Sequence, residues 1–153
     1  GFVFIGIIKV ENEPFVIEYN VRMGDPETQV ILPRIKSDFL KMMISTANQS
    51  LNSIKLEVDT NSAATVVMVS GGYPEDYEKE KEIVGIPKET KETIVFQAGT
   101  KMLKGKTVTN GGRVLSVTSI AENFKEALKK SYSKIEGISY EKKYFRKDLG
   151  FDL

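Results

Sequence analysis

The sequence contains neither cysteine nor histidine. The absence of cysteine excludes a disulfide framework, a thiol nucleophile and a thiolate metal site, and it fits a reducing compartment. The absence of histidine removes the commonest general base, Ser-His catalytic arrangements and imidazole metal ligands. Any metal bound by this chain must therefore be a hard cation held by oxygen ligands.

The sequence also has almost no net charge. Its 153 residues include 22 Lys or Arg and 21 Asp or Glu, a poor balance for attracting nucleic acid through the field of the whole chain. Basic residues outnumber acidic ones by 12 to 6 from position 101 to position 153. Such a bias is typical of a solvated face, and it leaves open a small substrate that carries phosphate. We expect no nucleic-acid partner.

Long apolar runs are absent as well. No run reaches the roughly 18 residues that cross a bilayer and no signal peptide is visible, so we expect no membrane partner and a cytoplasmic location. Hydrophobic residues at 41% and charged residues at 28% are typical of a globular chain. The strand pattern begins directly after Gly1, which favours a piece of a longer protein.

The first two β-rich runs predict an antiparallel hairpin. They are "FVFIGIIKV" at 2–10 and "FVIEYNVRM" at 15–23, and the turn-like segment "ENEP" separates them. The first run is apolar almost throughout, which indicates a strand covered on both faces. In the second run polar and apolar residues alternate, which is typical of a strand with one polar face.

Two helices are predicted after the hairpin. "GDPETQVIL" favours a short helix with Asp25 as its N-cap and Pro26 at its first position, ended or kinked by Pro33. Ser37 is the predicted cap of a second helix that runs to about Asn48. The apolar stripe of that helix would consist of Leu40, Met43, Ile44 and Ala47.

The rest of the chain predicts a sheet and one long helix. Five β-rich segments lie at 53–58, 63–70, 93–98, 106–109 and 113–119. "NGG" at 110–112 predicts a tight hairpin turn between the last two of them. Ser119 with Glu122 matches a capping box ahead of a helix whose apolar positions continue to Ile135.

The composition changes near residue 60, which divides the chain into two parts. We predict an α+β fold with a boundary there. The part at 1–60 would hold the hairpin and helices, and the part at 61–153 would be a small domain with a mostly antiparallel sheet and one or two helices.

Three polar side chains at alternate positions suggest a site. Glu18, Asn20 and Arg22 would emerge on one face of the second strand, about 6.5–7 Å apart along it. Carboxylate and amide oxygens that converge in this way can hold a hard cation such as Mg²⁺. The guanidinium fork of Arg22 suits a carboxylate or a phosphate. From the alternation alone, a simple solvated strand face is the other interpretation.

Several segments together resemble one known family. "IEYNVRMGDPETQ" at 17–29 is similar to the metal-binding strand of the glycinamide ribonucleotide synthetase (phosphoribosylamine–glycine ligase) family of the ATP-grasp superfamily. Only Met23 departs from that pattern, which has an aromatic residue there. The similarity continues in order through "KSDF", "VVMVSGGYPEDY", "VFQAGT", "VTNGGRVLSVTS" and "FRKDLGF". Gln97 stands where the family commonly has histidine, and it can hydrogen-bond but cannot titrate near neutral pH.

The resemblance implies roles for residues in both parts of the chain. Glu18 and Asn20 would be ligands of Mg²⁺ or Mn²⁺, and Arg22 would be the catalytic residue that stabilises the transferring phosphoryl group or an acyl phosphate. The substrate-binding residues would be Gly24, Asp25, Pro26, Glu27 and Arg113. For Arg113, a tight turn followed by a partly buried arginine in a salt bridge is the alternative.

The implied reaction joins glycine to 5-phosphoribosylamine with ATP, through glycyl phosphate, in purine biosynthesis. Residues 1–60 would be the end of the ATP-grasp domain and 61–153 the C-terminal domain. The chain has no Gly-rich phosphate loop, ATP-clamping lysine or amine-binding domain, so we expect it to be inactive alone. The full-length enzyme would be a monomer, whereas a severed sheet edge in the piece could favour self-association.

Two other functions stay open. A carboxylating or formyl-transferring purine enzyme of the same superfamily is disfavoured because "GDPETQ" and "NGGRV" are typical of the glycine ligase. A non-catalytic binding or scaffolding module that retains the C-terminal domain fold is the alternative from another class. The sequence upstream of Gly1 would distinguish the module from the enzyme.

Overall fold

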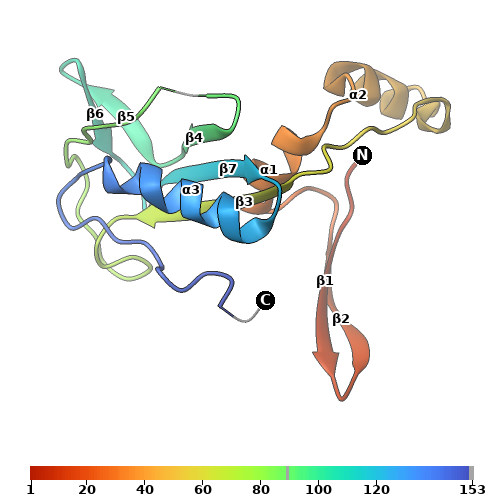
Figure 1. The fold of residues 1–153 in the computed structure, drawn as a ribbon, viewed down its shortest axis with the longest axis horizontal. Coiled ribbons are helices and arrows are strands. Elements are labelled where there is room, and N and C mark those ends of the chain that lie inside the picture. The colour runs from red at the N-terminus through yellow and green to blue at the C-terminus, as the bar shows by residue number, and fades with distance from the viewer. Residues whose placement is uncertain (89, 152–153) are drawn as a thin grey trace. The chain divides into compact units, whose positions relative to one another are not determined.

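The computed structural model describes residues 1–88 and 90–151. The chain forms two compact units, Gly1–Asp59 and Thr60–Leu153 (Figure 1). Both units combine helices with antiparallel strand pairs, which confirms the predicted α+β class. In the described part of the chain no helix is long and apolar enough to cross a membrane.

The first unit opens with the predicted antiparallel hairpin. Strand β1 (Phe4–Val10) pairs with β2 (Glu13–Asn20). Glu11 and Asn12 connect them with φ angles of 50° and 72°, and positive φ at both positions suits a two-residue turn between right-twisted strands. The expectation that the first strand is covered on both faces is wrong, because most residues of both strands are exposed.

Four short helical segments follow the hairpin. They are α1 (Glu27–Ile31), the 3-10 turn η1 (Leu32–Arg34), α2 (Phe39–Ala47) and the 3-10 turn η2 (Leu51–Ser53). The predicted caps are each wrong by one residue: Pro26 rather than Asp25 precedes α1, and Asp38 rather than Ser37 caps α2. The Ser37 hydroxyl instead accepts a hydrogen bond of 2.7 Å from the amide of Glu57.

The first unit buries little of its apolar surface. Within its described residues, Met42 of α2 is the one hydrophobic residue that is buried. Leu40 and Ile44, which belong to the predicted apolar stripe of α2, are 69% and 53% exposed. Phe2 stacks on Phe39 with ring centroids 6.2 Å apart. The predicted stripe is therefore wrong about which face of α2 is buried in this chain.

The second unit contains a three-stranded antiparallel sheet and a separate hairpin. Its elements are β3 (Ser62–Val69), β4 (Thr93–Gln97), β5 (Thr100–Leu103), β6 (Lys106–Thr109), β7 (Arg113–Ala121) and α3 (Phe124–Glu136). The sheet order is β3-β7-β4, and β5 pairs with β6. The predicted hairpin across 110–112 is wrong, because that turn connects strands of two different sheets. The predicted strand at 53–58 is reduced to one bridge between Ile35 and Val58.

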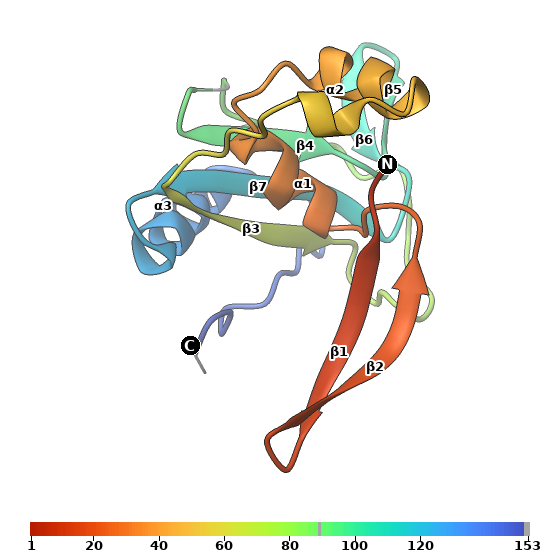
Figure 2. The same cartoon turned by 90° about the vertical axis from the view of Figure 1, so that its right-hand side faces the viewer.

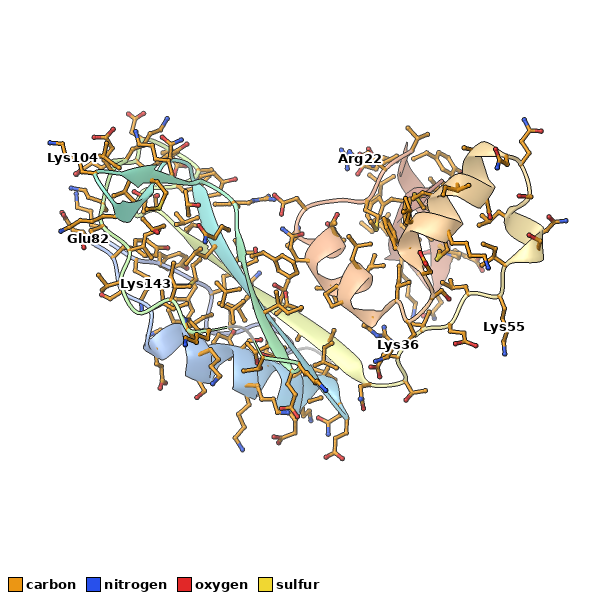
Figure 3. All side chains as sticks on the ribbon, turned by 90° about the horizontal axis from the view of Figure 1, so that it is seen from above. Arg22, Lys36, Lys55, Glu82, Lys104 and Lys143 are labelled. Atoms are coloured by element: carbon orange, nitrogen blue, oxygen red, sulfur yellow. The ribbon has the colours of Figure 1, made fainter. Side chains whose placement is uncertain are left out.

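The core of the second unit lies between the sheet and α3. Ala127, Ser131 and Ile135, spaced four residues apart, are fully buried along one side of α3, and the helix covers a face of the sheet (Figure 2). Lys143 donates to the carbonyl oxygens of Ile135 and Ile138, at 3.2 Å and 2.6 Å, and so caps the C-terminal end of α3 (Figure 3).

The N-terminal cap of α3 differs from the prediction. The side chain of Asn123 accepts a hydrogen bond of 3.0 Å from the amide of Glu126. The predicted cap, Ser119, lies inside β7, and its buried hydroxyl is 3.0 Å from the hydroxyl of Thr93. The helix itself is present as predicted.

Candidate functional site

Glu18 and Asn20 lie on the same face of β2, at its C-terminal end. They pair with Gly6 and Phe4 of β1, and the register is regular from Glu18 to Asn20. Side chains two positions apart on such a strand emerge on one face. Glu18 is exposed and Asn20 is half-buried. Two oxygen-bearing groups are therefore presented together, as expected from the sequence.

A β-bulge lies immediately before Glu18. Gly6 pairs with Glu18, but the next residue of β1, Ile7, pairs with Val16, so Ile17 has no partner in the ladder. A bulge locally bends and twists the strand, which re-aims the side chains beside it. The strict alternation predicted from Ile17 onward therefore holds only after the bulge.

Arg22 does not continue the polar face of the strand. The strand ends at Asn20, and Arg22 lies two residues beyond it, exposed (Figure 3). Its guanidinium nitrogen Nη1 makes a contact of 3.4 Å with the carbonyl oxygen of Met23. The structure thus brings Glu18 and Asn20 together on one strand face, and it places Arg22 in the segment that follows.

Gly6 is a residue of this site that the sequence pattern did not assign. A Cβ added to Gly6 would lie 3.1 Å from Cγ of Glu18, so glycine leaves room on the face where Glu18 emerges. An isolated glycine in a β-branched run is the signal that was available, since it often marks a bulge or a close approach.

The segment 24–29 forms a turn braced by its own side chains. The carbonyl oxygen of Gly24 accepts hydrogen bonds from the amide and the hydroxyl of Thr28, at 3.0 Å and 2.6 Å. A Cβ on Gly24 would overlap the carboxylate of Glu27, which folds back against this glycine. Gln29 donates from Nε2 to Oδ1 of Asp25 at 2.9 Å. Thr28 and Gln29 therefore support the residues that the resemblance assigns to the substrate.

Gln29 also carries an unusual buried atom. Its Oε1 is buried and, in the described part of the chain, has no hydrogen-bond partner. Arg34 Nε, in the adjoining η1, is also buried and has no hydrogen-bond partner among the described residues. Buried polar atoms are nearly always paired in native proteins, so these two atoms are exceptions in this helical segment.

Oxygen donors are the groups available for a metal ion. Within the described residues, no three Asp, Glu, His or Cys side chains gather as a ligand set. A carboxylate and an amide oxygen on one strand face nevertheless suit Mg²⁺, which keeps several waters and commonly takes one or two protein ligands plus phosphate oxygens. Glu18 and Asn20 are thus compatible with such an ion in their chemistry and placement.

Arg113 belongs to the second unit, at the start of β7. It pairs with Val69 of β3, and a second β-bulge lies beside it, since Leu115 pairs with Met68 and Val114 is skipped. Tyr140 donates from its hydroxyl to the carbonyl oxygen of Val69 at 2.9 Å. Burial raises the pKa of that Tyr140 hydroxyl, so it stays protonated and donating in alkaline solution as well as at neutral pH.

Gln97, which stands where the family commonly has histidine, ends β4. Its side chain is exposed, and Oε1 accepts a hydrogen bond of 3.0 Å from the hydroxyl of Thr100. An amide in this place makes a neutral contact within its own loop. It therefore introduces no titrating group at this end of the sheet.

Comparison with known proteins gives a consistent result. The family model "Phosphoribosylglycinamide synthetase, C domain" matches residues 63–152. The chain is 43% identical to a phosphoribosylamine–glycine ligase of Fusobacterium nucleatum over 153 residues, covering 98% of this chain and 36% of that protein. It is 45% identical to the human trifunctional purine biosynthetic protein adenosine-3, covering 99% of this chain and 15% of that protein.

A solved structure agrees with these relatives. The crystal structure of a phosphoribosylamine–glycine ligase from Thermotoga maritima superposes with a TM-score of 0.78 at 36% identity, covering 97% of this chain and 36% of that one. The chain thus spans about a third of the single-function ligases that it matches.

Proposed function

Because the chain belongs to the phosphoribosylglycinamide synthetase family, we propose that it is the C-terminal part of a phosphoribosylamine–glycine ligase. The whole enzyme joins glycine to 5-phosphoribosylamine with ATP, through glycyl phosphate, in cytoplasmic purine biosynthesis. The main support is a similarity that extends over nearly the whole chain, well beyond the matched C domain. Residues 1–60 then form the end of the ATP-grasp domain, and residues 61–153 form the C-terminal domain.

In this proposal Glu18 and Asn20 hold a divalent ion, Mg²⁺ or Mn²⁺. When bound, the ion neutralises charge on the terminal phosphates of ATP. The exposed position of Glu18 and the common strand face support the role. With two protein ligands, water and phosphate oxygens must complete the coordination shell.

Arg22 is proposed to stabilise the transferring phosphoryl group or glycyl phosphate. Its exposure and its long contact with Met23 leave the guanidinium easy to re-aim towards an anion. Between the two acidic residues, Asp25 is the better acceptor for the ammonium group of glycine, because Gln29 fixes its carboxylate. The carboxylate of Glu27 folds back against Gly24 and would first have to move away from it to bind the ammonium group.

The isolated chain is proposed to be inactive and to bind nucleotide weakly. It corresponds to about a third of the length of its single-function relatives. The whole enzyme is proposed to be a monomer, whereas the apolar side chains exposed on the first unit would favour self-association of the piece. The most exposed of them are Val3, Ile17, Leu40, Tyr19 and Val21.

The decisive experiment compares Glu18→Ala with Glu11→Ala in the full-length ligase. Glu11 is an exposed glutamate in the hairpin turn of the same strand pair, so it controls for loss of charge. We expect Glu18→Ala to reduce glycine-dependent ADP release by about 10³-fold or more with an unchanged melting temperature, since the metal acts on transition-state charge. Unaltered turnover would refute the metal role. Turnover by residues 1–153 alone, or a micromolar dissociation constant for Mg·ATP by calorimetry, would refute the proposed inactivity.

A further inference from the structure

Three segments far apart in the sequence meet at one end of the sheet of the second unit. They are residues 70–73, which follow β3, residues 98–99, which follow β4, and residues 110–112, which precede β7. Because β3 and β4 both run antiparallel to β7, the ends of the first two strands and the start of the third lie together (Figure 2). Arg113, the first residue of β7, lies at this end of the sheet.

Hydrogen bonds from the segments that follow β3 and β4 hold the backbone at residues 111–113. Ser70, which is 3% exposed, donates from its amide to Gly112 O at 2.8 Å and from its hydroxyl to Gly111 O at 2.9 Å. From the other side, the amide of Gly99 donates to Arg113 O at 2.8 Å. The main chain from 111 to 113 is therefore fixed by three bonds of ordinary length.

The ring of Tyr73 is seated directly on Gly112. A Cβ added at Gly112 would overlap the ring carbons Cδ2 and Cε2 and would lie 3.0 Å from Cγ. Tyr77 packs edge-on against Tyr73 with ring centroids 6.0 Å apart, so a second ring helps to hold the Tyr73 ring in place. Gly112 does not adopt a positive φ, so its lack of a side chain is required by the ring rather than by its backbone conformation.

We propose that Tyr73 is a positioning residue for Arg113 and acts through Gly112. The ring fixes the residue that precedes Arg113, and the bulge at Val114 fixes the residue that follows it. Between these two constraints the Cα–Cβ direction of Arg113 is set by the fold. The inference rests on the proposed function, in which Arg113 contacts an anionic group of a substrate.

The test uses steady-state kinetics of the full-length ligase with each of its three substrates. Arg113→Ala identifies the substrate whose KM depends on this arginine, with an increase of about tenfold or more expected from loss of a charged hydrogen bond. Gly112→Ala should raise the KM of the same substrate with little change in kcat. Gly137→Ala is the matched control, because a Cβ there meets nothing closer than 3.6 Å.

A double variant separates positioning from general damage. Tyr73→Ala removes the ring without creating a clash and should raise the same KM. Adding Gly112→Ala to Tyr73→Ala should then cause no further loss, since the atoms that the new Cβ would overlap are gone. If Gly112→Ala fails to fold, Tyr73→Ala alone still decides the question.

The outcomes distinguish the substrate role of Arg113 from the positioning role of Tyr73. If Arg113→Ala leaves every KM unchanged, the substrate role of Arg113 is wrong and the positioning role falls with it. If Arg113→Ala raises a KM but Tyr73→Ala and Gly112→Ala behave like Gly137→Ala, the proposed function stands and the positioning inference is wrong.

Discussion

Ile135 offers a quantitative test of the core of the second unit. Its side chain is fully buried in the cluster formed by α3 and the sheet. Ile135→Ala removes three carbon atoms, which corresponds to about 2.4 kcal/mol of transfer free energy at roughly 0.8 kcal/mol per buried methylene. The cavity left behind adds to this, so we expect a loss of about 3–4 kcal/mol in the free energy of unfolding. For a domain of this size class the melting temperature should fall by about 12 °C or more.

The same substitution in the first unit provides the control. Ile7 lies in β1 and is 58% exposed, so Ile7→Ala should change the free energy of unfolding by less than about 0.5 kcal/mol. Urea unfolding followed by far-ultraviolet circular dichroism measures both variants. Equal losses for the two substitutions, or a loss below about 1 kcal/mol for Ile135→Ala, would refute the assignment of the core to the second unit.

Three further results are expected. Ser119→Ala leaves the buried Thr93 hydroxyl without its 3.0 Å partner and should cost about 1–3 kcal/mol in urea unfolding. Adding Thr93→Val should recover part of that loss, and a purely additive double variant would contradict the pairing. Ion pairs with Lys142 and Lys81 lower the pKa of Glu78 to about 2 from 4.5. Its stabilising contribution is therefore complete above pH 4.5 and lost as the pH falls towards 2. Glu78→Gln should flatten this part of the dependence of the urea midpoint on pH, and an unchanged profile would exclude the effect. In hydrogen exchange of the chain, amides of the two-stranded β1–β2 hairpin should exchange much faster than those of β7, which is the central strand of the three-stranded sheet. Equal protection would contradict the separate, exposed hairpin.

The periodicity of the sequence predicted where helices lie better than where they begin. The helix α3 is present as predicted, but its cap is Asn123 instead of Ser119. Both residue types cap helices well. The choice depends on where β7 ends, and pairing with β3 extends β7 to Ala121, beyond Ser119. A local motif cannot include this long-range pairing, so the capping-box prediction failed while the helix prediction succeeded.

Strand partners were harder to predict than strands. The "NGG" turn at 110–112 favours a hairpin between its two flanking strands, yet β6 pairs with β5 and β7 pairs with β3 and β4. The partners of β7 lie far away in the sequence, and a turn signal contains no information about them. The burial of β1 was predicted wrongly for a similar reason. An apolar run predicts that a strand is covered but does not identify which part of a protein covers it.

The candidate site shows both the value and the limit of the alternation rule. Alternation placed Glu18 and Asn20 on one face because both follow the bulge at Ile17, and it failed for Arg22 because the strand ends first. The second bulge, at Val114, lies beside Arg113. In the β1–β2 pair and in the β3–β7 pair the register therefore shifts next to a residue that the family resemblance assigns to function. A bulge turns a polar side chain out of the regular pleat, so the positions that alternation describes least well are those where a site is most readily built.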